Sequence, residues 1–269
     1  MDPVRLFISL PFQRDGNAQD YPDCIRLFKA PELNRYLSAL REEIASAAEG
    51  LEDCLVTELV FGVGSFCHIP ADDLEALYRL IGEHFQLSAK VKVTLQAAPR
   101  GFDFYRLTAA RHMNQALIHF LTPSLYEDAL REAGFCPAGE LLAALEVCFQ
   151  NGYHRFCCVV SPKRNPTPGS LRATLTGLLE KGPCGFCFDA PLNVGERQLV
   201  AETLGESYRE TPEGWFLPGS AQSAAQIDQI GCGLAAVTQV GEVRVKASAD
   251  LDFYCAHATD FESLVQPID

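Results

Sequence analysis

The stretch Val4-Arg5-Leu6-Phe7-Ile8-Ser9-Leu10-Pro11-Phe12 begins the pattern on which the fold of this chain depends. The apolar run from Val4 to Leu10 predicts a short buried strand, and Pro11 ends it because proline cannot donate a ladder hydrogen bond. Apolar side chains then recur at helical spacing over residues 31–48, and residues 55–61 predict a second strand. Strand, helix and strand in this order are typical of a parallel α/β sheet.

The same alternation continues as far as residue 188. Further strands are predicted at residues 91–95, 116–120, 155–160 and 184–188. Further helices are predicted at residues 70–85, 104–111, 137–149 and 171–180. Five or six such units indicate an α/β fold. The pattern weakens after Pro191, so we place a soft boundary there and expect residues 191–269 to form an extension that packs on residues 1–190.

Composition and charge narrow the class of protein. The chain has 269 residues, of which 48% are apolar, and this is enough for a sizeable core. Its net charge of −13 and the lack of a Lys/Arg block disfavour a nucleic-acid binder, because phosphate contacts need clustered cations. The N-terminus does not resemble a signal peptide, and no apolar run could span a bilayer. Eleven cysteines without a signal sequence are typical of cytosolic thiols, so we expect a cytoplasmic protein that binds neither nucleic acid nor membrane.

Several segments in a fixed order carry a family resemblance. The first is the opening stretch quoted above, which runs from a strand into Pro11-Phe12. The others are Phe61-Gly62-Val63-Gly64-Ser65-Phe66, Val93-Thr94-Leu95-Gln96-Ala97-Ala98-Pro99, Thr167-Pro168-Gly169-Ser170-Leu171 and Ile230-Gly231-Cys232-Gly233. Together they resemble the radical S-adenosylmethionine oxygen-independent coproporphyrinogen III oxidase family and its haem-chaperone relatives.

This resemblance implies a partial (β/α) barrel of the radical S-adenosylmethionine type with a short C-terminal extension. Sites in such barrels lie at the carboxyl ends of the strands. Gly62, Gly64 and Ser65 match the remnant of the family's cofactor cradle, which would hold S-adenosylmethionine. The resemblance further implies that the family's usual C-terminal helical domain is absent from residues 1–269.

This chain departs from the family pattern at the positions that carry the family's catalytic chemistry. Where the family has C-x-x-x-C-x-x-C after the first strand, this chain has Gln13, Asn17 and Asp20. Iron–sulfur clusters need thiolate ligands, and amides are poor substitutes. Val63 replaces the middle glycine of the cradle, where a side chain would hinder close approach of the cofactor. Four further family positions are occupied by Gln96, Gln115, Cys158 and Val237.

We therefore expect a degenerate member of this fold without S-adenosylmethionine, cluster or radical catalysis. Such a protein would act as a binding or partner subunit. Its partner would be an active homologue or another protein of tetrapyrrole metabolism.

A second hypothesis keeps catalysis. In it, relocated cysteines hold zinc or a cluster for an oxidoreductase of tetrapyrrole metabolism, since these metals accept thiolate and imidazole ligands. The candidates are Cys67, Cys157, Cys158, Cys184 and Cys187. Adjacent Cys157 and Cys158 alternate faces of a strand, so only one can face the barrel. The simpler interpretation is buried, apolar cysteines.

A third hypothesis is a haem or porphyrin carrier. His119, which we expect at the end of the fourth strand, is a candidate iron ligand, and Lys163 and Arg164 are candidates for binding propionates. The alternative for His119 is a histidine that only packs in the core, and the alternative for Lys163 and Arg164 is a solvated loop. The single tryptophan, Trp215, is expected either to cap the barrel or to mark a partner surface.

Overall fold

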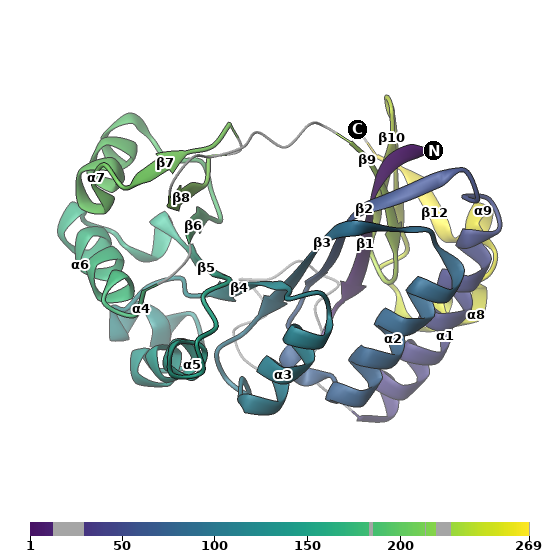
Figure 1. Cartoon of the computed structure of the whole chain (residues 1–269), viewed down its shortest axis with the longest axis horizontal. Helices are drawn as coiled ribbons and strands as arrows, with labels where there is room; N and C mark the ends of the chain where they lie inside the picture. Colours follow the sequence, from purple (N-terminus) through teal and green to yellow (C-terminus); the bar gives the residue numbers. More distant parts are fainter. Residues whose placement is uncertain (13–29, 183–184, 213, 219–226, 269) are drawn as a thin grey trace.

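A curved sheet with helices on its outer side forms the frame of the molecule (Figure 1). The computed structural model describes residues 1–12, 30–182, 185–212, 214–218 and 227–268. Parallel strands follow one another along the chain. They are β1 (Asp2–Leu10), β2 (Cys54–Val63), β3 (Leu87–Ala97), β4 (Leu117–Leu121), β5 (Phe156–Val160) and β6 (Gly185–Phe188).

The crossover connections between these strands are helical. They are α1 (Ala30–Ala48), α2 (Ala71–His84), α3 (Phe104–His112), α4 (Glu127–Glu132), α5 (Ala138–Gln150) and α6 (Pro168–Leu179). Two 3-10 turns, η2 (Phe66–His68) and η3 (Pro162–Arg164), follow the carboxyl ends of β2 and β5. The predicted α/β alternation is thus confirmed up to β6, with boundaries that shift by a few residues.

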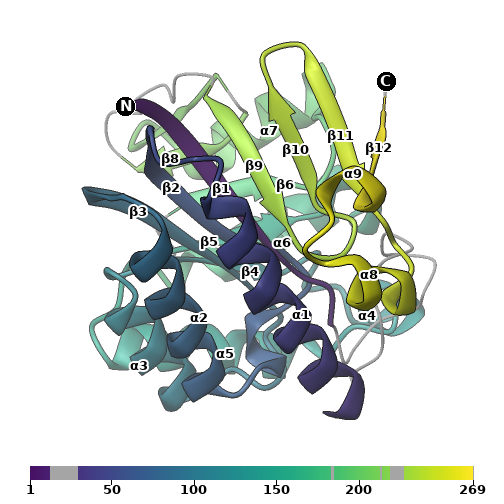
Figure 2. The ribbon, with the colours of Figure 1, turned by 90° about the vertical axis from the view of Figure 1, so that its right-hand side faces the viewer.

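The remaining residues extend both edges of the same sheet. Helix α7 (Val194–Leu204) packs on α6, and β7 (Tyr208–Glu210) and β8 (Phe216–Pro218) add antiparallel strands beyond β6. At the other edge, β9 (Asp228–Cys232) lies parallel to β1. The elements that follow are β10 (Val237–Val240), β11 (Val243–Ala247), α8 (Leu251–His257), α9 (Phe261–Leu264) and β12 (Val265–Pro267). The division at residue 190 stays a prediction, but strands from both sides of it share one sheet (Figure 2).

The main core lies between the sheet and its outer helices. Strand β1 buries Leu6, Ile8 and Leu10 completely. The apolar stripe predicted on the first helix is confirmed, since α1 buries Leu33, Tyr36, Leu37, Leu40 and Ile44. Burial of these faces provides the main stabilisation of the fold.

Two expectations about local structure were wrong. His119 does not end its strand but is the middle residue of β4. The strand begins at Leu117 rather than Ala116 because Asn114 and Gln115 form a left-handed turn, with φ of 54° and 55°. The Asn114 side chain stabilises this turn by donating a 2.7 Å hydrogen bond to the Val91 carbonyl. No helix in the described part of the chain is long and apolar enough to cross a membrane.

Candidate functional site

The segment after β2 keeps the backbone of a glycine-rich turn. Val63 has φ of 75°, in the left-handed region that a β-branched residue rarely adopts. Gly64 lies so close to β1 that a Cβ atom would be 2.3 Å from the Leu10 carbonyl oxygen and 2.7 Å from that of Phe12. Only glycine fits at residue 64, because these neighbours are backbone atoms.

Ser65 holds the turns after β2 and β3 together. Its buried hydroxyl accepts hydrogen bonds from the backbone N–H groups of Ala98, at 2.7 Å, and Cys67, at 3.2 Å. Its own N–H group donates to the Phe12 carbonyl at 3.2 Å. Among the predicted cradle residues, Gly64 and Ser65 are therefore engaged in packing within the protein.

The inner face of the sheet carries a row of residues from five adjacent strands. The register places Gln96 of β3 level with His119 of β4, which is level with Cys157 of β5 and then Gly185 of β6. At the other end of the row, a Cβ atom on Gly62 would lie 3.4 Å from the Gln96 side-chain oxygen. This row faces away from the outer helices, because the alternate residues of each strand form the core.

His119 is packed but not fully hydrogen-bonded. Its ring lies edge-on to Trp215, with 5.0 Å between ring centroids, and its buried Nε2 atom has no hydrogen-bond partner among the described residues. Burial lowers the pKa of His119 to about 4, so the imidazole is neutral at pH 7. A neutral ring can ligate a metal or accept a proton. Trp215 packs against this ring, while the roles expected for it, as a cap of the barrel or part of a partner surface, stay predictions.

Lys163 and Arg164 lie in η3, directly beyond the carboxyl end of β5, as expected. Asp189, which follows β6, lies near them. Burial raises the pKa of Asp189, and the Ser161 hydroxyl and the two cations partly offset this. His119 lies level with Cys157, so it is deeper along the strands than Lys163 and Arg164. His119 and the two cations therefore lie at different levels along the strands.

The four candidate cysteines that the structure describes do not gather into one metal site. Cys157 lies on the inner face beside His119, whereas Cys158 belongs to the core on the opposite face, so the predicted alternation is confirmed. Burial raises the pKa values of Cys67 and Cys187 to about 12, so both thiols are protonated at pH 7. Cys184, like Gln13, Asn17 and Asp20, lies outside the described residues. Within the described ranges, no group of three or more His, Cys, Asp and Glu residues could hold a metal ion.

A buried polar cluster around Asn165 was not predicted. The Asn165 amide donates to the carbonyls of Pro123 and Ser161, at 2.9 and 2.8 Å, and its oxygen accepts from the Ser124 and Thr174 hydroxyls. These contacts join the loop after β4, the loop after β5 and helix α6. The Ser, Asn and Thr side chains stand in loops or at ordinary helix positions, so the sequence carries no signal for this cluster.

Comparisons with known proteins bear on the fold of this chain. No family model and no curated protein sequence matches the chain. Among solved structures, the radical S-adenosylmethionine enzyme coproporphyrinogen III oxidase (HemN) of Escherichia coli aligns with a TM-score of 0.81 and 16% identity. The alignment covers 100% of this chain and 72% of that enzyme.

The fold is that of a radical S-adenosylmethionine enzyme. The predicted resemblance to coproporphyrinogen III oxidase is confirmed at the level of fold, and with it the (β/α) barrel-like architecture. At this identity, however, the likeness does not determine the chemistry of the site.

Two further solved structures align less closely with this chain. The archaeal Elp3 of Methanocaldococcus infernus has 9% identity and a TM-score of 0.44, and covers 76% of this chain and 53% of its own. HydG, a maturase of [FeFe]-hydrogenase, has 12% identity and a TM-score of 0.42, and covers 71% and 44%.

Proposed function

We propose that this protein is a coproporphyrinogen-oxidase-like barrel without an iron–sulfur cluster or radical catalysis, and that it acts as a binding or partner protein. The observation that carries the proposal is Val63. Its backbone keeps φ of 75°, a conformation natural to glycine, while its side chain occupies the position at which the resemblance expects a bare glycine. The turn thus has a glycine-like backbone at a residue with a β-branched side chain, and on this proposal that side chain hinders the close approach of a cofactor.

The residues that would hold a cluster support the same conclusion. Gln13, Asn17 and Asp20 occupy the three family cysteine positions, and Cys24 is the only cysteine in residues 1–30. One cysteine cannot supply three thiolates from this segment. The residues present therefore do not fit the family's cluster.

Binding of S-adenosylmethionine tests this proposal. Equilibrium dialysis of the full chain against the labelled cofactor is expected to show no saturable binding, with E. coli coproporphyrinogen III oxidase as the positive control. Saturable, stoichiometric binding would refute the proposed loss of the cradle. The same dialysis of Val63→Gly shows whether the valine side chain is a barrier by itself.

Carriage of haem or a porphyrin is a second candidate, favoured by one observation. His119 presents a neutral imidazole on the inner face, its Nε2 atom without a hydrogen-bond partner in the described part of the chain, and Lys163 and Arg164 follow β5. Ligation of haem iron by Nε2 would require neighbouring side chains to move, because the atom is buried.

Titration with haemin tests this candidate. The expected result is a saturable shift of the haem absorbance band that His119→Ala removes, with a change in tryptophan fluorescence. Trp215 is the only tryptophan of the chain, so the emission reports on this face directly. A spectrum that His119→Ala leaves unchanged would exclude His119 as the ligand.

A further inference from the structure

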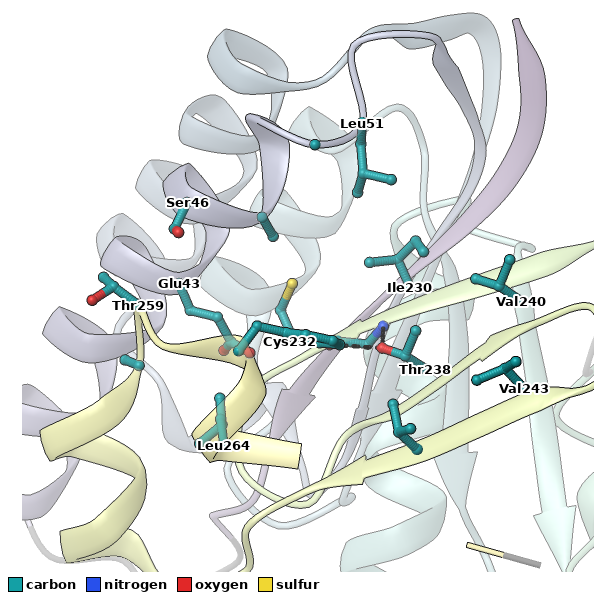
Figure 3. A pocket seen from close by; sticks show the side chains of 16 residues that line it. Glu43, Ser46, Leu51, Ile230, Cys232, Thr238, Val240, Val243, Thr259 and Leu264 are labelled. Carbon is teal, nitrogen blue, oxygen red and sulfur yellow. Dashed lines mark hydrogen bonds between the residues drawn. The ribbon is translucent and has the colours of Figure 1, made fainter. Parts of the chain in front are cut away.

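A cavity of ≈ 440 Å³ lies between helix α1, strands β9–β11 and the α8–α9 segment (Figure 3). This volume is in the range of small-molecule sites. The cavity lies on the helix-covered side of the sheet, so it is separate from the inner-face row described above. Its walls are mainly apolar and include Ala47, Leu51, Ile230, Val240, Val245 and Leu264.

One carboxyl group stands in this apolar lining. Glu43 of α1 is only 6% exposed, and its Oε2 atom accepts hydrogen bonds from the Gly233 N–H group, at 2.7 Å, and the Tyr254 hydroxyl, at 2.6 Å. Both of these hydrogen bonds fall on Oε2, and the Glu43 side chain lines the cavity. Figure 3 shows the Glu43 side chain extending from α1 toward Cys232 of β9.

Glu43 has no positively charged partner. No Lys or Arg lines the cavity, and no salt bridge reaches Glu43 within the described part of the chain. Burial raises the pKa of Glu43 to about 7, although the Tyr254 hydroxyl and the Gly233 N–H partly offset this. The titratable groups that face it are Tyr36, Cys232 and Tyr254, and all three have pKa values raised well above normal by burial, so they are neutral.

We propose that this cavity binds an apolar amine, with the ligand's ammonium group paired to Glu43 Oε1 and its apolar body against the walls. A buried charge is stable only when it is paired, and an ammonium group supplies the counter-ion that the protein lacks here. A carboxylate ligand would meet like charge, and a neutral alcohol could offer only a hydrogen bond. The net charge of −13 further favours a cation.

Three rigid probes of one shape separate these ligand classes. Calorimetric titration of the full chain with 1-adamantylamine is expected to show saturable 1:1 binding. We expect 1-adamantanol to bind at least tenfold more weakly and adamantane-1-carboxylate not to bind. Equal affinity for the amine and the alcohol, or no binding of the amine, would overturn the proposal.

Variants place the binding at this cavity. Glu43→Gln keeps an acceptor for Gly233 and Tyr254, so it is expected to fold and to lose at least tenfold in amine affinity. Glu42→Gln, at the neighbouring exposed residue, is the matched control and should leave affinity unchanged. Ala47→Phe fills the cavity from α1 and should abolish binding of every probe. Binding that survives Ala47→Phe would show that the amine sits elsewhere.

The pH dependence gives a test that needs no variant. An ammonium ligand selects the ionised carboxylate, so its affinity should rise up to about tenfold per pH unit as pH approaches 7 and level off above it. If Glu43→Gln does not fold, this profile and Ala47→Phe decide the matter. An affinity independent of pH between 5 and 8 would contradict the pairing.

Discussion

At the scale of single residues, Val63 and Glu43 occupy environments that their side chains do not favour. Val63 holds a positive φ, which costs a β-branched residue on the order of 1–3 kcal/mol. Glu43 is a carboxyl group buried without a cation. The effect of each residue on the free energy of unfolding can be measured.

Val63→Gly is expected to change the free energy of unfolding by less than about 1 kcal/mol. Relief of the positive φ should offset both the lost packing and the ~1 kcal/mol by which glycine favours the unfolded chain. Val60, also on β2, half-buried and without a positive φ, is the matched control. Val60→Gly should cost about 2 kcal/mol or more in urea unfolding. Equal losses in the two variants would show that residue 63 carries no strain.

Glu43 should make stability depend on pH in an unusual direction. The pKa of Glu43 is about 7 in the folded protein, whereas its ordinary value, which applies to the unfolded chain, is 4.5. Between these pH values the folded protein therefore binds more protons than the unfolded chain. Stability from this group is therefore lost as pH rises from about 4.5 to about 7, by about 3 kcal/mol. The measurement is the difference in unfolding free energy between wild type and Glu43→Gln across this range. A difference that does not vary with pH would mean that Glu43 titrates normally.

At the scale of elements, Asn165 connects the loops after β4 and β5 to α6 through four hydrogen bonds. Asn165→Ala should cost about 3 kcal/mol, because it leaves buried carbonyls and hydroxyls unpaired. Hydrogen exchange should quicken in α4 and α6. The exposed Asn151, which bonds only to the Val147 carbonyl through its side chain, is the control, and Asn151→Ala should cost less than about 0.5 kcal/mol. Similar losses would argue against the bridging role.

The strand–helix units up to β6 were predictable because apolar periodicity is a local signal. The apolar stripe of α1 and the apolar run of β1 each predict which of their own residues are buried. Helix α7 was not predicted because apolar and polar residues are not clearly separated onto two faces. Its apolar residue Val194, for example, is largely exposed. The pairing of β9 with β1 joins residues more than two hundred positions apart, and no local pattern encodes it.

The candidate sites were predictable to a smaller extent for the same reason. The sequence indicated that Cys157 and Cys158 face opposite sides, and that Lys163 and Arg164 follow β5. It did not indicate that Trp215 packs against His119, nor that Glu43 would be buried. Those two facts depend on residues distant in the chain, since Glu43 meets Gly233 and Tyr254 only in the folded molecule.

At the scale of the whole molecule, the chain shares its fold with E. coli coproporphyrinogen III oxidase. The sheet, the outer helices and the turn after β2 agree with that fold. The family resemblance aligns Gln13, Asn17, Asp20 and Val63 with positions of the cluster and the cofactor, while the described strands and helices bury their apolar faces. This separation is the basis for proposing a binding or partner protein.

The central claim is tested most directly by the iron and sulfide content of the full chain after anaerobic reconstitution. Wild type is expected to retain neither and to show no absorbance band of a cluster, under conditions in which the E. coli enzyme is reconstituted. The triple variant Gln13→Cys, Asn17→Cys and Asp20→Cys shows whether the missing thiols alone account for this result. Stoichiometric iron and sulfide bound to the wild-type chain would contradict the account.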